Sequence, residues 1–240
     1  MNIELDVHTH TIVSGHAYST IQEMANAAAE KNLKLLGITD HAPALPGACH
    51  EIYFRNLHVI PRVINGVKLL IGAELNILNT NGDIDLSEEM LDKLDVRVAG
   101  IHSLCYTPGT KEENTAGLLK VINHPKIEII SHPGDGTALL DFEQIVLAAK
   151  TTRTLLEINN SSLNPIRHKL VARENNLTLL KLCKKYEVPI ILGSDAHISF
   201  DVANYTFVYE LLNEVEFPDS LIVNTSVSML ASFISSVQDS

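Results

Sequence analysis

Short apolar runs of strand length recur along the chain and alternate with segments of helical periodicity. Each run is about four to six residues long and rich in Val, Ile and Leu, which is typical of a buried strand. Seven such runs occur, at residues 3–7, 35–39, 68–73, 96–101, 127–130, 154–158 and 189–193. We therefore predict seven buried strands.

Helices are predicted between and after these strands. They cover residues 19–29, 112–123, 142–150, 176–186, 202–214 and 227–237. Ser19-Thr20-Ile21-Gln22 is a capping-box pattern at the start of the first helix, and Asp141 is placed to cap the third. The apolar run at 221–223 is either a weak eighth strand or a packing segment.

The alternation of strands and helices predicts an α/β fold with parallel strands and crossover helices. Such a fold is either a doubly wound sheet or a closed barrel. The chain has 240 residues, of which 45% are hydrophobic, so one core can enclose all of them. We predict a single domain over residues 1–240.

Composition excludes several classes of protein. No apolar run approaches the roughly 20 residues that cross a bilayer, so we expect a cytoplasmic protein with no membrane partner. Cys49, Cys105 and Cys183 are odd in number and form no CxxC pair, which argues against disulfides and thiolate zinc sites. The formal charge of -11 makes nucleic acid an unfavoured partner. The sequence predicts no oligomeric state.

Histidines and two carboxylates cluster after the predicted strands. His8 and His10 follow the first strand, His41 the second, Glu74 the third, His102 the fourth, His132 the fifth, and Asp195 and His197 the seventh. In a parallel barrel all carboxyl ends of strands lie on one face, whereas a doubly wound sheet gathers them less completely. This placement therefore favours a barrel with a polar site at its mouth.

The types of these side chains indicate a metal site. Any one histidine is more often a hydrogen-bonded structural residue than a ligand, but their shared position at strand ends favours ligands. His8 and His10, like Asp195 and His197, are two positions apart, which puts both side chains on one side of an extended segment. Imidazole and carboxylate without thiolate suit zinc, manganese or iron in a catalytic cluster.

Six short segments contain these residues: Asp6-Val7-His8-Thr9-His10, Thr39-Asp40-His41, Gly72-Ala73-Glu74, Gly100-Ile101-His102-Ser103, Ser131-His132-Pro133-Gly134 and Gly193-Ser194-Asp195-Ala196-His197. Together they resemble the motifs of the PHP (polymerase and histidinol phosphatase) family. The resemblance spans essentially the whole chain in the expected order. It implies a distorted, TIM-barrel-like (β/α)7 barrel of the stand-alone bacterial phosphatase branch.

The same resemblance implies three divalent metal ions, with Zn²⁺ first and Mn²⁺ or Fe²⁺ as alternatives. The three implied ligand sets are His8, His10, Glu74 and Asp195; Glu74, His102 and His132; and His16, His41 and His197. Glu74 would bridge two ions. His16 lies in the loop after the first strand and is assigned through the resemblance rather than by its spacing.

The implied activity is hydrolysis of small phosphomonoesters by a hydroxide that bridges two metal ions. We expect Glu74, Asp195 and His197 to be catalytic. Arg167 is a candidate phosphate contact because guanidinium groups bind phosphate with two hydrogen bonds, although a long loop often carries an unrelated surface arginine. Asn159 ends the sixth strand and is a candidate for substrate contact or for support of the ligands.

Three other functions remain open. A PHP-type phosphodiesterase or nuclease is compatible with the motifs but fits the acidic composition poorly. An amidohydrolase-like enzyme also uses histidines at barrel ends, yet it usually has a bridging lysine, and no lysine ends a predicted strand here. A non-catalytic metal-binding module differs from all of these by its lack of turnover.

Overall fold

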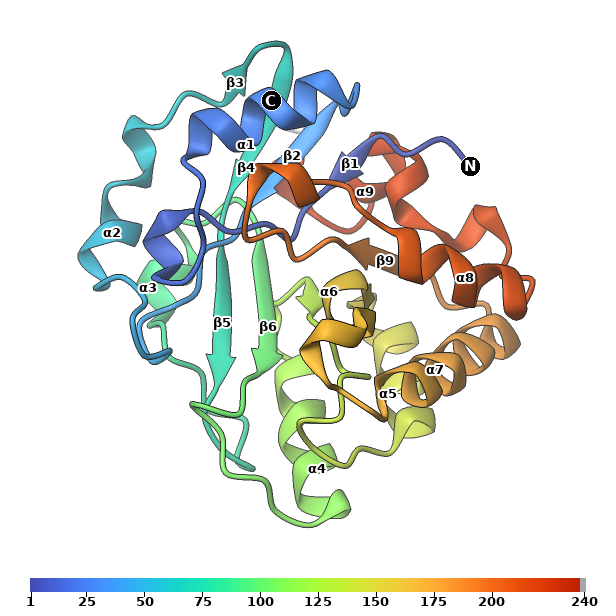
Figure 1. Ribbon diagram of the computed structural model, residues 1–240. Coiled ribbons are helices and arrows are strands. Elements are labelled where there is room, and N and C mark those ends of the chain that lie inside the picture. Colours follow the sequence, from blue (N-terminus) through green and yellow to red (C-terminus); the bar gives the residue numbers. More distant parts are fainter. Residues whose placement is uncertain (238–240) are drawn as a thin grey trace.

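The computed structural model describes residues 1–237, in which two mainly parallel sheets are surrounded by helices (Figure 1). The strands are β1 Leu5–Asp6, β2 Leu35–Ile38, β3 Val63–Ile64, β4 Val67–Ile71, β5 Ala73–Ile77, β6 Arg97–Ile101, β7 Ile129–Ile130, β8 Leu155–Asn159 and β9 Ile190–Gly193. One sheet has the order β1-β2-β4-β3 and the other β5-β6-β7-β8-β9. Every pair is parallel except β3 with β4. The parallel α/β prediction is confirmed.

Helices follow most of the strands. They are α1 Ile21–Glu30, α2 Ile52–Arg55, α3 Glu88–Leu91, α4 Lys111–Ile122, α5 Phe142–Thr152, α6 Asn160–Leu163, α7 Ala172–Tyr186, α8 Thr206–Glu214 and α9 Val227–Leu230. The capping box of α1 consists of Thr20 and Glu23, one residue later than the predicted box of Ser19 and Gln22. Asp141 caps α5 by accepting a hydrogen bond from the Gln144 amide. Helices α4, α5, α7 and α8 pack in succession beside the five-stranded sheet (Figure 1). No helix within residues 1–237 is long and apolar enough to cross a membrane.

Gly72 divides the predicted third strand into two. Residues 68–73 were expected to form one strand, but β4 pairs with β2 whereas β5 pairs with β6. The Gly72 amide donates to the Ile38 carbonyl at 2.8 Å. A Cβ atom at Gly72 would lie 2.1 Å from the Val96 carbonyl oxygen. Only glycine fits this close approach, so the chain passes here from one sheet to the other.

The first and last strands also lie side by side. Thr9 and Ala196 form an isolated parallel bridge beyond the ends of β1 and β9. The His10 amide donates to the Ala196 carbonyl at 2.9 Å, and the Asp195 amide donates to the His8 carbonyl at 3.0 Å. Segments from opposite ends of the chain therefore meet at the carboxyl ends of these strands.

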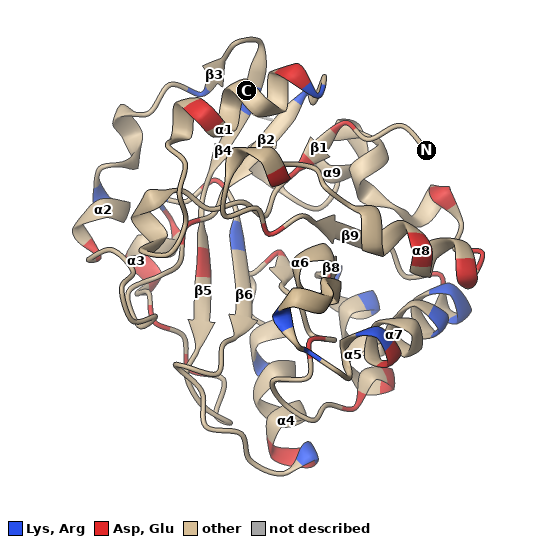
Figure 2. Ribbon diagram, viewed as in Figure 1, with Lys and Arg blue, Asp and Glu red and all other residues tan. Residues whose placement is uncertain are grey.

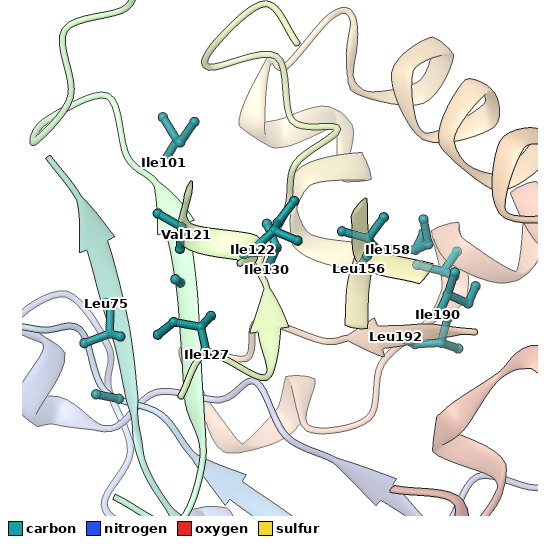
Figure 3. Packing of buried hydrophobic residues seen from close by; sticks show 14 of the residues in the cluster. Leu75, Ile101, Val121, Ile122, Ile127, Ile130, Leu156, Ile158, Ile190 and Leu192 are labelled. Carbon is teal, nitrogen blue, oxygen red and sulfur yellow. The ribbon is translucent and has the colours of Figure 1, made fainter. Parts of the chain in front are cut away.

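Two apolar clusters lie on opposite faces of the strands. The larger one includes Ile130, Leu156 and Leu192 of the five-stranded sheet together with Val121 and Ile122 of α4 (Figure 3). The smaller one gathers side chains from seven parallel strands, namely Leu5, Leu35, Leu70, Val98, Ile129, Leu155 and Ile191. Successive strand residues alternate between the clusters because side chains of a strand point to opposite faces.

The C-terminal region differs from the prediction. Run 221–223 is a packing segment: Ile222 makes one bridge with Ile190, between the short 3₁₀ helices Asp219–Leu221 and Val223–Thr225. The helix predicted over 202–214 begins only at Thr206, because Ala203 has a left-handed φ of 52° and its amide donates to Asp6. The helix predicted over 227–237 is wrong, since α9 ends at Leu230 and the chain turns to bury Ile234 and Val237 in the smaller cluster.

Candidate metal centre

All nine predicted ligands lie together, most of them just beyond the carboxyl end of a strand. His8 and His10 follow β1, His41 follows β2, Glu74 lies in β5, His102 follows β6, His132 follows β7, Asp195 and His197 follow β9, and His16 follows the 3₁₀ turn after β1. The sequence separation between these residues reaches 189 positions, from His8 to His197, in a chain of 240 residues. The parallel arrangement of the strands is what brings them to one place.

Glu74 is at the centre of this cluster and is fully buried. Its Oε1 lies 2.9 Å from His132 Nε2, 3.2 Å from His102 Nε2 and 3.3 Å from His8 Nε2. Its Oε2 lies 2.9 Å from His41 Nδ1 and 3.6 Å from His10 Nε2. One carboxylate thus faces five imidazoles.

Asp195, His16 and His197 complete the cluster on its outer side. Asp195 Oδ1 lies 3.3 Å from His10 Nε2, and the Nε2 atoms of His16 and His197 are 2.9 Å apart. The ligand atoms of three groups lie within 4.8 Å of one another: His8, His10 and Glu74; His41, Glu74 and His102; and His10, His41 and His197. These groups overlap with the sets implied by the family resemblance but are not identical to them.

Several polar atoms in the cluster lack hydrogen bonds. His8 Nε2, His10 Nε2, His41 Nδ1 and Glu74 Oε2 are buried and have no hydrogen-bond partner among the described residues, even though His41 and Glu74 approach to 2.9 Å. A buried polar atom without a partner costs about 1–3 kcal/mol. Cations bound between these atoms would remove that cost, so the donor set fits divalent metal ions.

The electrostatics of the cluster favour ionised carboxylates but not neutral imidazole at every position. Burial would lower the pKa of His8, but Glu157 and Glu74 outweigh it and raise the pKa well above its usual value. Burial alone would raise the pKa of Glu74, but the imidazoles of His8, His102 and His41 outweigh it and hold the pKa well below its usual value. Burial is also outweighed at Asp195, whose pKa is held low by His8 and His10. Burial lowers the pKa of His10, and its neighbours His41 and His197 lower it further. Ionised carboxylates and neutral imidazole are the ligand forms.

Asp40 stabilises the cluster through hydrogen bonds to residues beside the ligands. Its carboxylate accepts hydrogen bonds from the Thr11 amide at 2.7 Å, from Ser14 Oγ at 2.7 Å and from the Tyr53 hydroxyl at 3.0 Å. Ser14 Oγ in turn lies 3.1 Å from His10 Nδ1. Because the second ring nitrogen is bonded, the orientation of the His10 ring is fixed, as is common for metal-binding imidazoles.

A cleft of about 400 Å³ opens directly above the cluster. Its lining includes His16, His41, Glu74, His102, His132, Asp195 and His197 together with Leu45, Pro46, Leu104, Asp135, Thr137, Ser161, Ser162, Arg167 and Lys169. Arg167, the candidate phosphate contact, lines the cleft. Its guanidinium group has no partner within residues 1–237, whereas Arg173 nearby in sequence pairs with Glu214.

Asn159 does not line the cleft. It is fully buried, accepts a hydrogen bond from the Ser162 amide and donates to Glu157 at 3.0 Å. Its side-chain nitrogen also lies 3.4 Å from Asp195 Oδ2. These contacts favour support of the cluster over substrate contact.

Sequence reasoning missed Lys169 and Asp135, which form an ion pair in the wall of the cleft. Asp135 Oδ2 also lies 3.7 Å from His132 Nδ1. Burial would raise the pKa of Asp135, but His132 and Lys169 outweigh it and lower the pKa. The position of Asp135, three residues after His132, was a usable signal for the carboxylate. Nothing local in the sequence marks Lys169.

The fold and the cluster define a class of parallel α/β proteins with histidines and carboxylates gathered at the strand ends, in an arrangement that could hold metal ions. Within this class, the model of the PHP domain matches residues 6–237, and the chain belongs to this family. A probable phosphatase of Clostridium novyi is 44% identical, with 98% of this chain and 96% of that protein covered. A probable phosphatase of Caldicellulosiruptor bescii is also 44% identical, with the same coverage.

Two solved structures share the fold. A histidinol phosphate phosphatase from Lactococcus lactis, in complex with zinc, L-histidinol and phosphate, matches with a TM-score of 0.63 at 19% identity, covering 91% of this chain and 95% of that one. A chain in an archaeal ribonuclease P complex with mature tRNA matches with a TM-score of 0.55 at 14% identity, covering 98% and 91%. The fold alone therefore occurs in quite different settings.

Proposed function

We propose that this protein is a metal-dependent phosphatase that hydrolyses small phosphomonoesters. The observation that carries the proposal is the buried Glu74 carboxylate among five imidazoles, with ring nitrogens of His8, His10 and His41 left without hydrogen bonds in the described part of the chain. The probable phosphatases at 44% identity support the activity. The zinc and phosphate bound by the histidinol phosphate phosphatase of the same fold support the choice of ligands.

Three divalent ions would be held by the sets that the PHP motifs imply. These sets are His8, His10, Glu74 and Asp195; Glu74, His102 and His132; and His16, His41 and His197. Zinc is the first choice. Iron also suits imidazole ligands, and manganese suits the carboxylates of the set. When bound, such ions activate water and neutralise charge on phosphoryl oxygens. Glu74 is common to two of these sets, and its negative charge would reduce the repulsion between the two ions.

The wall of the cleft provides groups for both parts of a phosphomonoester. The guanidinium group of Arg167 would bind phosphate oxygens with two hydrogen bonds. Leu45, Pro46 and Leu104 form an apolar surface for the alcohol part. Leu104 is 70% exposed although it lines the cleft, so a bound substrate would cover apolar surface that is now in water.

The size and charge of the molecule favour a small substrate. A cleft of about 400 Å³ is at the lower end of the range for small-molecule sites. Acidic and basic side chains are interspersed over the helices in Figure 2, and the net charge is -11. A long polyanion needs a basic surface, so a nuclease is the weaker candidate.

The strands are best interpreted as a distorted (β/α)7 barrel in one domain. The contacts of β1 with β9 support this interpretation, as do those of β2 and β6 with the chain around Gly72. The site would then lie at the barrel mouth, where such enzymes place their active sites. We also propose that the protein is located in the cytoplasm.

Turnover by the metal-loaded protein tests the function. We expect hydrolysis of p-nitrophenyl phosphate to exceed that of bis(p-nitrophenyl) phosphate, with competitive inhibition by inorganic phosphate. Faster cleavage of the diester would instead favour the phosphodiesterase. If the fully metallated protein cleaved neither ester above background, it would be a non-catalytic metal-binding module.

A further inference from the structure

Strand β8 provides no proposed metal ligand, yet it carries a buried carboxylate beside the cluster. The side chain of Glu157 is 1% exposed. Its Oε1 lies 2.6 Å from His8 Nδ1. Its Oε2 accepts hydrogen bonds from the His132 amide at 2.8 Å and from Asn159 Nδ2 at 3.0 Å. Both oxygens of Glu157 therefore act as acceptors.

The neighbouring strand leaves space for this carboxylate. Gly193 of β9 pairs with Asn159 of β8. A Cβ atom at Gly193 would lie 1.7 Å from Glu157 Oε1. A glycine is thus needed at this position if Glu157 is to reach His8.

Two of the proposed ligands near Glu157 have strained backbones. His132 has a φ of 33° and Asp195 a φ of 53°, both in the left-handed region that residues other than glycine rarely adopt. Such strain persists when surrounding bonds fix it, and it is concentrated at functional sites. Glu157 accepts from the His132 amide itself, and through Asn159 it is linked to Asp195.

We propose that Glu157 is a positioning residue that aligns two adjacent metal sites. It accepts the Nδ1 proton of His8, which turns the unprotonated Nε2 toward Glu74 and Asp195. It also holds the backbone of His132, so that Nε2 of this residue points at the second proposed site on Glu74. The proposal rests on the metal-dependent function proposed above.

Glutamine is the informative substitution because it keeps the size of the side chain and removes one acceptor. If the amide oxygen of the new side chain accepted from His8, its NH₂ group would face the His132 amide, which is also a donor. If it accepted from His132, the NH₂ group would donate to His8 Nδ1 and force the proton onto Nε2, where the metal should bind. Neither orientation satisfies both histidines.

The test measures zinc affinity, by competition with a chromogenic chelator, together with bound zinc per chain and the melting temperature of the metal-free protein. We expect Glu157→Gln to weaken zinc binding by about 10- to 100-fold, which is the usual effect of losing a partner of a metal-bound histidine. The two ions that share Glu74 should be lost before the third. In the wild type, zinc-bound His8 should show a protonated Nδ1 by ¹⁵N NMR, and this signal should disappear in the variant.

Glu128→Gln is the matched control. Glu128 is also a poorly exposed carboxylate, but it lies before the amino end of β7 and pairs with Arg97, away from the cluster. This variant should lower the melting temperature and leave zinc affinity unchanged. Glu157→Asp retains two acceptor oxygens on a side chain that is one methylene shorter. The zinc affinity of this variant should therefore lie between those of the wild type and Glu157→Gln.

Unchanged zinc affinity in folded Glu157→Gln would overturn the proposal. If that variant does not fold, unchanged affinity in Glu157→Asp would overturn it equally. Failure of the proposed function has a different signature: the wild type would bind zinc and cleave no phosphoester. Zinc affinity does not depend on turnover, so the two results are separable.

Discussion

His41 and Glu74 are neighbours through both their backbones and their side chains. They form an isolated parallel bridge between the segment after β2 and β5, and His41 Nδ1 lies 2.9 Å from Glu74 Oε2. The Glu74 amide also donates to the Asp40 carbonyl at 3.0 Å. The distance between a histidine of one sheet and the central carboxylate of the other is thus set by main-chain hydrogen bonds.

Glu74→Ala should remove two of three metal ions. The first two proposed sites lose a shared ligand and a negative charge, whereas the site on His16, His41 and His197 keeps every protein ligand. We expect bound metal to fall from about three to about one per chain, with loss of phosphatase activity. Elemental analysis measures the bound metal, and a phosphate-release assay measures the activity.

His58→Ala is the control for this experiment, because His58 is exposed and lies in a short helix away from the cluster. It should retain metal and activity. Circular dichroism checks that Glu74→Ala is folded. Full metal content and near-normal turnover in folded Glu74→Ala would show that the bridging assignment is wrong.

Chelation should inactivate the protein reversibly and destabilise it. Metal that binds only the folded state at 1,000 times its Kd stabilises that state by about 4 kcal/mol, which corresponds to roughly 10 °C in melting temperature for a chain of this size. Calorimetry before and after treatment with EDTA measures the shift. No change in melting temperature on chelation would argue against metal at the buried histidines.

Arg167→Ala should weaken the binding of phosphomonoesters. Loss of hydrogen bonds from a charged group costs about 1.5–3 kcal/mol, so we expect kcat/KM for p-nitrophenyl phosphate to fall by about 10- to 100-fold. Inorganic phosphate should also inhibit the Arg167→Ala variant less strongly than the wild type. Arg173→Ala is the matched control, because Arg173 pairs with Glu214 on the surface. Equal values of kcat/KM for both variants would show that Arg167 does not bind the substrate.

Leu104→Ser should change the preference for the alcohol part of the substrate. Burial of each methylene contributes about 0.8 kcal/mol, and a partial loss of this contact lowers kcat/KM for p-nitrophenyl phosphate by about 5-fold. Cleavage of glycerol phosphate should be unaffected, since its alcohol is polar. Leu139→Ser is the control, because Leu139 is equally exposed and does not line the cleft. A uniform effect on both substrates would contradict the apolar contact.

The three cysteines should react slowly with Ellman's reagent at pH 8. Burial raises the pKa of the Cys49 and Cys183 thiols to about 12 and that of Cys105 to about 11. The thiolate is the reactive form and is scarce far below the pKa. Three thiols should react at once in guanidinium chloride. Rapid titration of one thiol in the native protein would identify a reactive cysteine that these pKa values do not allow.

The parallel α/β class and the clustering of histidines were predictable because they depend on patterns repeated along the chain. His102 follows β6 directly, and His132 follows β7 after one residue, so each strand end carries its own local signal. The change of sheet at Gly72 was not predictable in the same way. It depends on the close approach of the Val96 carbonyl, which belongs to a distant segment.

Tertiary contacts also explain the remaining differences. The residues after α9 turn because Ile234 and Val237 bury their side chains among strands far away in sequence. Lys169 reaches the cleft through its pair with Asp135, in a loop whose shape no pattern specifies. The metal assignments at the nine positions stay predictions, and the elemental analysis of Glu74→Ala tests the assignment of Glu74.

The meeting of the first and last strands has a consequence for how the molecule is made. Ser194 donates a hydrogen bond to Asp6 across 188 positions of sequence, and Asp195 faces His8 and His10 in the same region. Contacts of such long range require costly loop closure and slow the folding of a domain. During synthesis, a chain that has not yet released residue 197 from the ribosome lacks one side of the cluster. The complete set of ligands can therefore assemble only after the segment that carries Asp195 and His197 has been translated and has left the ribosome.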